Sequence, residues 1–190
     1  SRTGTVARLF NLDDEPLLTM HPADLRQRDL RDGELARVRN RRGSIIVRVA
    51  ADEGMPCGRA WLPMHWGSRY MDSAGVNALT TPARDPFSQQ PELKHTAVAV
   101  DKAGLPWQLV VLRLADGGEA GTPTLLASAR RLLDEFDFAT VGLYGRQQPL
   151  VILRAAHRQP LPEERLQEID RLFGLDDDGA AIVYTDRQRQ

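Results

Sequence analysis

The spacing of prolines, glycines and apolar residues changes near residue 103, and this change limits most strongly the folds that the chain can adopt. Up to about residue 100, prolines and glycines interrupt the sequence too often for helices longer than about two turns. Beyond that point, apolar residues recur over longer segments with the spacing of helices and strands. We therefore predict two domains, residues 1–103 and 104–190, a division that suits a chain of 190 residues.

Composition excludes several classes of protein. With 42% hydrophobic and 27% charged residues, the chain has the balance of a soluble globular protein. Its single cysteine, Cys57, can form neither an internal disulfide nor a multi-cysteine zinc or iron-sulfur site. A net charge of −1 provides no field that would attract nucleic acid or an anionic membrane. No apolar run approaches the roughly 20 residues that span a bilayer. We therefore expect a cytoplasmic protein with no nucleic-acid and no membrane partner.

The first predicted domain consists of short strands joined by turns. Pro22 has the fixed φ angle that suits the first turn of a helix, and this helix is expected to be brief. Residues 35–50 alternate on both sides of Arg42-Gly43, which predicts a hairpin with its arginines on the open face. Short strands with one brief helix favour a small barrel. The predicted strands are residues 17–20, 35–39, 44–50 and 60–64.

The second predicted domain has longer elements in the order βαββαβ. This order is that of a ferredoxin-like α+β sandwich, in which the apolar faces of both helices lie on the sheet. The predicted strands are residues 107–114, 139–144, 150–155 and 180–184, and the predicted helices are residues 123–136 and 161–173.

Between the two regular regions, residues 67–94 show little periodicity. Loops beyond roughly 12 to 15 residues are uncommon in compact proteins unless they are functional or disordered. This segment carries more large apolar side chains than a disordered linker holds, so we interpret it as an ordered loop that packs on another part of the protein.

Asn77 in this loop stands between apolar neighbours. A buried carboxamide without partners costs roughly 1 to 3 kcal/mol, so Asn77 must either bind a ligand or satisfy the backbone by capping a turn or short helix. Lys94 is one of only two lysines among 25 basic residues, and it either holds an anionic group such as phosphate or is a solvated loop cation. The pair His65-Trp66 either stacks on a planar ring or completes the core.

Other kinds of site have no support in the sequence. The four histidines do not pair at metal-ligand spacing, and no cysteine or carboxylate cluster accompanies them. The chain contains no Gly-x-Ser-x-Gly elbow, no Walker loop and no complete dinucleotide fingerprint. We therefore predict no metal ligand and no catalytic residue in this chain.

Eight short sequence words run in order through the first 100 residues, and together they are far more specific than any one of them. They resemble the C-terminal molybdopterin-dinucleotide-binding domain of bacterial molybdenum oxidoreductases, most closely that of the assimilatory nitrate reductase catalytic subunit. The words are Arg2-Thr3-Gly4, His21-Pro22-Ala23-Asp24, Leu30-Arg31-Asp32-Gly33, Arg41-Arg42-Gly43, Leu62-Pro63-Met64-His65-Trp66-Gly67, Val76-Asn77-Ala78-Leu79-Thr80, Asp85-Pro86-Phe87-Ser88 and Pro91-Glu92-Leu93-Lys94.

This resemblance implies a double-psi β-barrel, mainly β and here without its first strand. It also implies that the domain closes over a bis(molybdopterin guanine dinucleotide) cofactor that holds one molybdenum. Asn77 and Lys94 would contact the cofactor, while His65 and Trp66 would line the approach to the site. Arg2 and Thr3 would lie just after a further cofactor-contacting segment.

The resemblance further implies the activity of a whole enzyme, which reduces nitrate to nitrite for assimilation. The iron-sulfur cysteines and the molybdenum ligand would belong to upstream catalytic domains of the same polypeptide, so this chain alone is predicted to be inactive. Because the chain begins without Met, we expect a fragment whose partners are those domains and an electron donor protein or domain. Residues 105–190 resemble an extension after the barrel, with a docking or spacer role. The alternatives are another molybdenum oxidoreductase, such as formate dehydrogenase, and a cofactor-free protein-interaction module.

Overall fold

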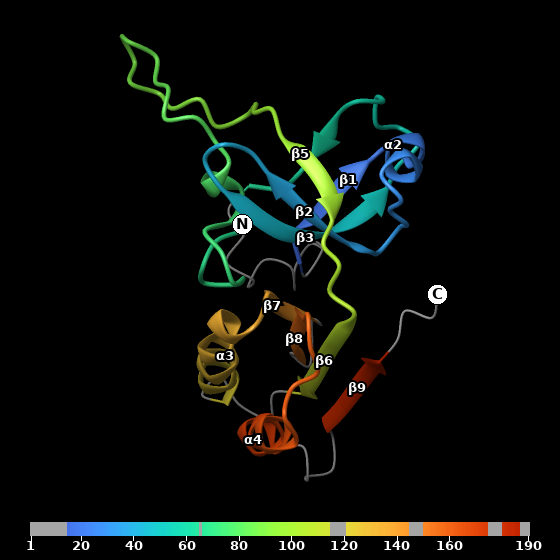
Figure 1. The fold of residues 1–190 in the computed structure, drawn as a ribbon. Helices are drawn as coiled ribbons and strands as arrows, with labels where there is room; N and C mark the ends of the chain where they lie inside the picture. Colours follow the sequence, from blue (N-terminus) through green and yellow to red (C-terminus); the bar gives the residue numbers. More distant parts are fainter. Residues whose placement is uncertain (1–14, 65, 115–120, 145–149, 175–179, 187–190) are drawn as a thin grey trace. The chain divides into compact units, whose positions relative to one another are not determined.

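A computed structural model describes residues 15–64, 66–114, 121–144, 150–174 and 180–186 (Figure 1). The chain forms two compact units, which are described separately. The N-terminal unit comprises Pro16–Ser68 and Ser73–Gly104. The C-terminal unit comprises Ser1–Glu15, Arg69–Asp72 and Leu105–Gln190. None of the described helices has the length and apolar character needed to cross a membrane.

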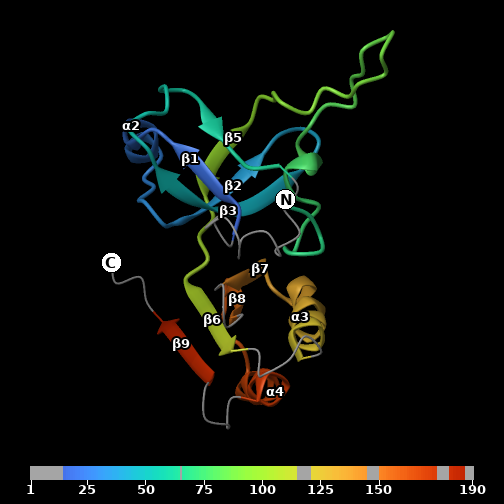
Figure 2. The same ribbon diagram turned by 180° about the vertical axis from the view of Figure 1, so that it is seen from behind.

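The N-terminal unit is built on a curled five-stranded sheet with the order β4-β1-β3-β2-β5 (Figures 1 and 2). Strands β1 and β3 pair in parallel, and the other pairs are antiparallel. The predicted hairpin is confirmed, with Val38 opposite Ile45. The elements are β1 (Leu17–Met20), α2 (Pro22–Gln27), β2 (Leu35–Arg39), β3 (Ser44–Ala51), β4 (Ala60–Trp61), the 3-10 helix η1 (Gly75–Ala78) and β5 (Ala99–Lys102).

Two strands of this sheet differ from the sequence-based expectation. The strand predicted at residues 60–64 is limited to the two residues of β4, and Pro63, which follows, has no N–H to donate to a strand pair. Strand β5 was not predicted, because its four residues show no clear alternation of apolar and polar residues. In the structure only Val100 of this strand is buried. Its place at the sheet edge is fixed by pairing with β2, and the side chain of Arg39 donates a hydrogen bond of 2.8 Å to Asp101.

The core of the N-terminal unit comes mainly from β1, β2 and β3. Alternate residues of these strands point inward, and the central positions of β3 are buried on both faces. Leu25 of α2 joins this core, and His21 caps the helix through its Nδ1 atom, which accepts from the Ala23 N–H at 3.1 Å. The predicted open face of the hairpin is confirmed at Arg39, whereas Arg37 and Arg48 are half-buried.

The C-terminal unit has a fully antiparallel four-stranded sheet with the order β7-β8-β6-β9. The predicted βαββαβ order is confirmed. The first helix is shorter than expected, because a separate 3-10 turn follows it, and the second begins only after Pro162 and ends at Gly174 in the left-handed conformation. The elements are β6 (Trp107–Leu114), α3 (Gly121–Arg131), η2 (Leu133–Glu135), β7 (Phe138–Tyr144), β8 (Leu150–His157), α4 (Glu163–Phe173) and β9 (Ala180–Asp186).

Residues Arg69–Asp72 of the irregular loop form part of the C-terminal unit, along the edge of β7. Met71 pairs with β7 in an antiparallel bridge, and the Val141 N–H donates to the Tyr70 carbonyl at 2.8 Å. Arg130 donates from Nε to the carbonyl of Arg69 at 2.9 Å, and its guanidinium lies 5.2 Å from the centre of the Tyr70 ring. Both Tyr70 and Met71 are buried. The prediction of an ordered, packed loop is therefore confirmed for these four residues, which cover a strand edge that would otherwise be open.

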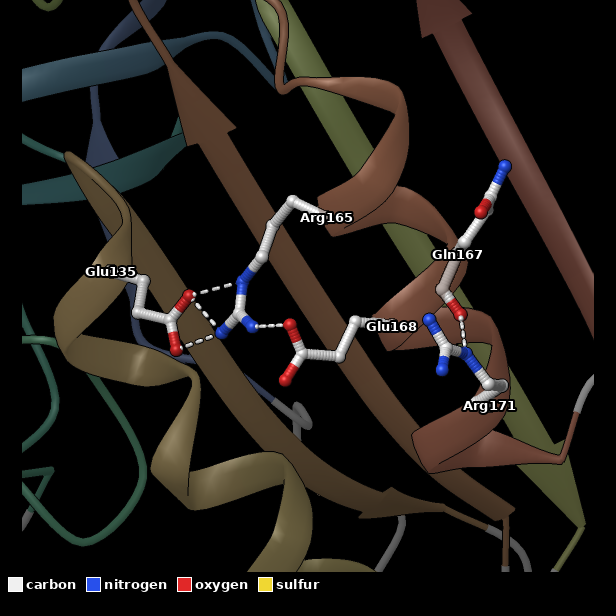
Figure 3. Close-up of polar contacts among 5 residues, drawn as sticks. All are labelled: Glu135, Arg165, Gln167, Glu168 and Arg171. Carbon is white, nitrogen blue, oxygen red and sulfur yellow. Dashed lines mark hydrogen bonds and ion pairs between the residues drawn. The ribbon is translucent and has the colours of Figure 1, made fainter.

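An ion-pair cluster joins the 3-10 turn η2 to helix α4 in the C-terminal unit (Figure 3). The guanidinium of Arg165 donates to both carboxylate oxygens of Glu135 and also to Glu168 on its own helix. These contacts raise the pKa of Arg165. Figure 3 also shows Arg171, which donates to the backbone carbonyl of Gln167 one turn earlier.

Candidate functional site

A pocket of about 390 Å³ lies within the N-terminal unit. This volume falls in the range of small-molecule sites, roughly 300 to 1,000 Å³. Strands β1, β2 and β4 contribute to its walls, together with the segments 76–80 and 93–98. The site is therefore built by residues far apart in sequence, and several of them belong to the irregular loop.

The chemistry of the pocket is mixed. Its walls are mostly aliphatic, and they include the ring of Trp61, which is 56% exposed although large apolar side chains are usually covered. The polar lining residues are Lys94, His95, Thr80 and Thr96. An apolar pocket with a flat aromatic surface and one cation suits a planar ring that carries an anionic group.

The structure brings one of the predicted site residues to this pocket. Lys94 lines it. Asn77 is exposed on η1 and is not among the lining residues, although its neighbour Val76 is; its backbone carbonyl accepts from the Thr80 hydroxyl at 3.1 Å. Trp66 is half-buried and also does not line the pocket. The predictions for Arg2, Thr3 and His65 fall outside the described residues.

Two glycines fix the position of η1, which carries Asn77. Gly75 has a φ of +67°, and a Cβ atom at this residue would lie only 1.7 Å from the carbonyl oxygen of Trp66. At Gly43, in the turn between β2 and β3, a Cβ atom would lie 2.7 Å from the carbonyl oxygen of Ala78. Both close approaches require the absence of a side chain, so η1 is packed against backbone on two sides.

Sequence reasoning missed Trp61 and Asn40. Trp61 directly precedes one of the matching sequence words, and this proximity was the only available signal. Asn40 directly precedes another word, and its carboxamide nitrogen donates to the carbonyl of Leu79 at 2.7 Å. No periodicity or motif predicts a hydrogen bond across 39 residues, so this contact emerges only from the fold.

Among the residues that the structure describes, no group of three or more histidine, cysteine, aspartate or glutamate side chains could hold a metal ion. The pocket therefore offers a cation, hydroxyls and an aromatic surface to a ligand. These groups can bind and orient an organic anion.

Comparison with known proteins places the N-terminal half of the chain in a family. Residues 1–97, more than half of the chain, match the model of the molybdopterin dinucleotide binding domain. The chain belongs to this family. The resemblance seen in its sequence words is thereby confirmed, and Lys94 and η1 both lie within the matched residues.

Two curated relatives are nitrate reductases. The chain is 41% identical over 100 residues to the nitrate reductase of Klebsiella oxytoca, and 36% identical over 100 residues to that of Synechocystis sp.. Each match covers 53% of this chain, but only 12% and 14% of the respective relative. The matched part of the chain thus spans about an eighth of the length of these enzymes.

Proposed function

We propose that this molybdopterin dinucleotide binding domain belongs to a molybdenum-dependent nitrate reductase, and that its pocket receives part of a molybdopterin guanine dinucleotide. The observation that carries the proposal is the position of Lys94. In this family member Lys94 is one of the residues that line a largely apolar pocket. Nitrate reductase is the activity named for both similar proteins.

The residues of the pocket fit such a ligand. A molybdopterin guanine dinucleotide has planar ring systems joined by phosphates. The half-exposed Trp61 ring offers a flat surface for a ring, and the Lys94 ammonium offers a charge partner for a phosphate. The aliphatic side chains offer apolar contacts to a ring, and the Thr80 oxygen, whose hydrogen is donated to the Asn77 carbonyl, can accept from a ring N–H. When bound, the cofactor supplies two-electron chemistry at molybdenum, and the residues of this chain hold and orient it.

We propose that the other residues predicted from the sequence also contact the cofactor or line the approach to it. Asn77 is exposed on the tightly packed η1, where a carboxamide is well placed to contact a ligand at the surface of this unit. Trp66, whose carbonyl packs against Gly75, is proposed to line the approach to the site together with His65. Arg2 and Thr3 are proposed to contact the cofactor because they belong to the family sequence word Arg2-Thr3-Gly4.

We also propose a specific fold for each of the two units. A parallel pair, β1 and β3, inside an otherwise antiparallel curled sheet supports a double-psi barrel for the N-terminal unit. For the C-terminal unit, the strand order β7-β8-β6-β9 with a helix after β6 and after β8 supports a ferredoxin-like sandwich.

In the whole enzyme, we propose that upstream domains of the same polypeptide supply the iron-sulfur centres and the molybdenum ligand. An electron donor protein or domain reduces these centres, and nitrate is converted to nitrite in the cytoplasm for assimilation. The present chain contributes cofactor binding and is inactive alone. Residues 105–190 serve a docking or spacer role in this arrangement.

The test uses the full-length protein that contains this chain. We expect the purified protein to contain molybdenum and to release pterin and GMP on acid hydrolysis, and to reduce nitrate with a reduced viologen dye as the donor. If the protein contains the full amount of cofactor but oxidises formate and does not reduce nitrate, its function would be that of a formate dehydrogenase and not of a nitrate reductase. Absence of both molybdenum and GMP from the folded protein would favour a cofactor-free interaction module and overturn the proposal.

A further inference from the structure

The side chain of Asn40 connects three segments of the N-terminal unit. Its Oδ1 atom accepts from the backbone N–H groups of Arg42 at 2.8 Å and Gly43 at 3.3 Å, within the turn between β2 and β3. Its Nδ2 atom donates to the Leu79 carbonyl at 2.7 Å, just after η1. The same nitrogen lies 3.4 Å from the Thr96 hydroxyl oxygen, two residues after Lys94.

The orientation of this carboxamide follows from its partners. Backbone N–H groups can only donate, so the atom facing Arg42 and Gly43 must be the oxygen. A carbonyl can only accept, so the atom facing Leu79 must be the nitrogen. The Thr96 hydroxyl completes the arrangement by donating to the same Leu79 carbonyl at 3.0 Å. Asn40 therefore uses its oxygen for its own turn and its nitrogen for two distant segments.

The two distant segments are the ones that bring polar groups to the pocket. Leu79 and Thr96 line it, and so do Thr80 and Lys94, which are close to them in sequence. Asn40 does not line the pocket itself, but it bonds to two residues that do, Leu79 and Thr96. A second close contact acts at the same place, because Gly43 packs against the backbone of Ala78.

We propose that Asn40 is a positioning residue for ligand binding, which sets the spacing between the loop segment with Thr80 and the segment with Lys94. This inference rests on the proposed function, since it assigns to Asn40 the alignment of the pocket for a phosphate-bearing planar ligand. Asn40 acts through Leu79 and Thr96 and touches no ligand atom.

The variant Asn40→Asp separates the two roles of the carboxamide. An aspartate keeps an oxygen for the turn, but it places a carboxylate oxygen against the Leu79 carbonyl, where no hydrogen bond can form without a proton. The matched control is Asp32→Ala. This change removes a 2.7 Å hydrogen bond that the Asp32 carboxylate accepts from the Ala51 N–H in the same unit, and neither residue lines the pocket.

In the full-length protein, we expect N40D to lower the GMP retained after dialysis about fivefold, whereas D32A retains the wild-type amount. The loss in N40D should shrink at acidic pH, because a protonated carboxyl group regains a donor for the Leu79 carbonyl. An equal loss of GMP in N40D and D32A, or no loss in N40D, would overturn the proposal.

A second measurement does not require the cofactor. In protein prepared without molybdenum cofactor, amide hydrogen exchange over residues 76–80 and 93–98 should accelerate in N40D and stay unchanged in D32A. Unchanged exchange in N40D would refute the positioning role even if the wild-type protein binds the cofactor. Conversely, absence of GMP from the wild-type protein would refute the proposed function, while the exchange result would still decide whether Asn40 holds the two segments.

If N40D fails to fold, the pair Thr96→Ser and Thr96→Val replaces it. Serine keeps the hydroxyl that donates to Leu79, and valine removes it at nearly the same volume. We expect T96S to retain GMP and slow exchange, and T96V to lose both. Equal behaviour of the two variants would contradict the inference.

Discussion

Gly75 packs so closely against Trp66 that a Cβ atom on this glycine would lie 1.7 Å from the carbonyl oxygen of Trp66. The contact joins two parts of the loop that the family sequence words single out, the segment before residue 68 and the 3-10 helix η1. It explains why a glycine with a φ of +67° precedes Asn77. A glycine is therefore required at residue 75 for two reasons, its positive φ angle and the close approach of the Trp66 carbonyl.

The variant Gly75→Ala should destabilise the N-terminal unit by about 2 to 4 kcal/mol, because a side chain at this position combines an unfavourable φ with a backbone clash. Denaturant unfolding of the full-length protein measures this loss. The control is Gly58→Ala, where φ is +76° but a Cβ atom would meet nothing within 4 Å. We expect only about 1 kcal/mol there, and equal costs at both positions would show that the contact with Trp66 does not matter.

The buried carboxyl group of Asp72 predicts that the stability of the C-terminal unit depends on pH. Burial raises the pKa of this carboxyl group from 3.8 to about 6, and its Oδ1 atom has no hydrogen-bond partner among the described residues. The folded state thus holds the proton more tightly than the unfolded state, so this group lowers stability as pH rises from about 4 to 6. Above pH 6 the penalty is complete.

The variant Asp72→Asn should therefore stabilise the protein above pH 6 by roughly 1 to 2 kcal/mol, less than the full pKa shift would give because the carboxyl group is partly solvated. The difference from wild type should shrink as the pH falls and vanish below about pH 3, where the carboxyl group is largely neutral in both states. Thermal unfolding across this pH range measures it. The exposed Glu53→Gln serves as the control, and a D72N curve parallel to that of E53Q would contradict the account.

The Arg165 cluster of Figure 3 predicts a salt-sensitive contribution to stability. Replacing Arg165 by methionine removes the link from α4 to Glu135 and should cost about 1 kcal/mol at low salt, with a smaller cost at 1 M salt. Arg171→Met on the same helix removes only a contact to its own helix backbone and should cost less than about 0.5 kcal/mol. Equal effects of the two variants in denaturant unfolding would show that the inter-element pair contributes nothing.

The sequence predicted the elements of the C-terminal unit well, because β6 and β8 are long and α4 has a sustained helical period. It did not predict β5, whose four residues become a strand only through pairing with β2. Nor could periodicity reveal that Tyr70 and Met71 would pair with β7, since that choice depends on an available sheet edge.

For the candidate site, the sequence identified Lys94 through its rarity and its family word, and the structure places it at the pocket. The sequence left Asn77 as either a ligand contact or a cap, and the structure exposes its side chain on η1, while its neighbours Val76 and Leu79 line the pocket. Trp61 and Asn40 were missed, since their roles arise from strands and turns that meet only after folding.

The most direct test of cofactor binding by this pocket compares the two lysines of the chain in the full-length protein. Lys94→Gln removes the cation of the pocket, whereas Lys102→Gln removes a cation that lies 3.3 Å from Glu34 and does not line the pocket. The measurement is the GMP released per polypeptide after dialysis. We predict about a tenfold loss in K94Q, as expected for one charge-assisted contact to phosphate, and wild-type content in K102Q. Wild-type GMP content in K94Q would contradict the account.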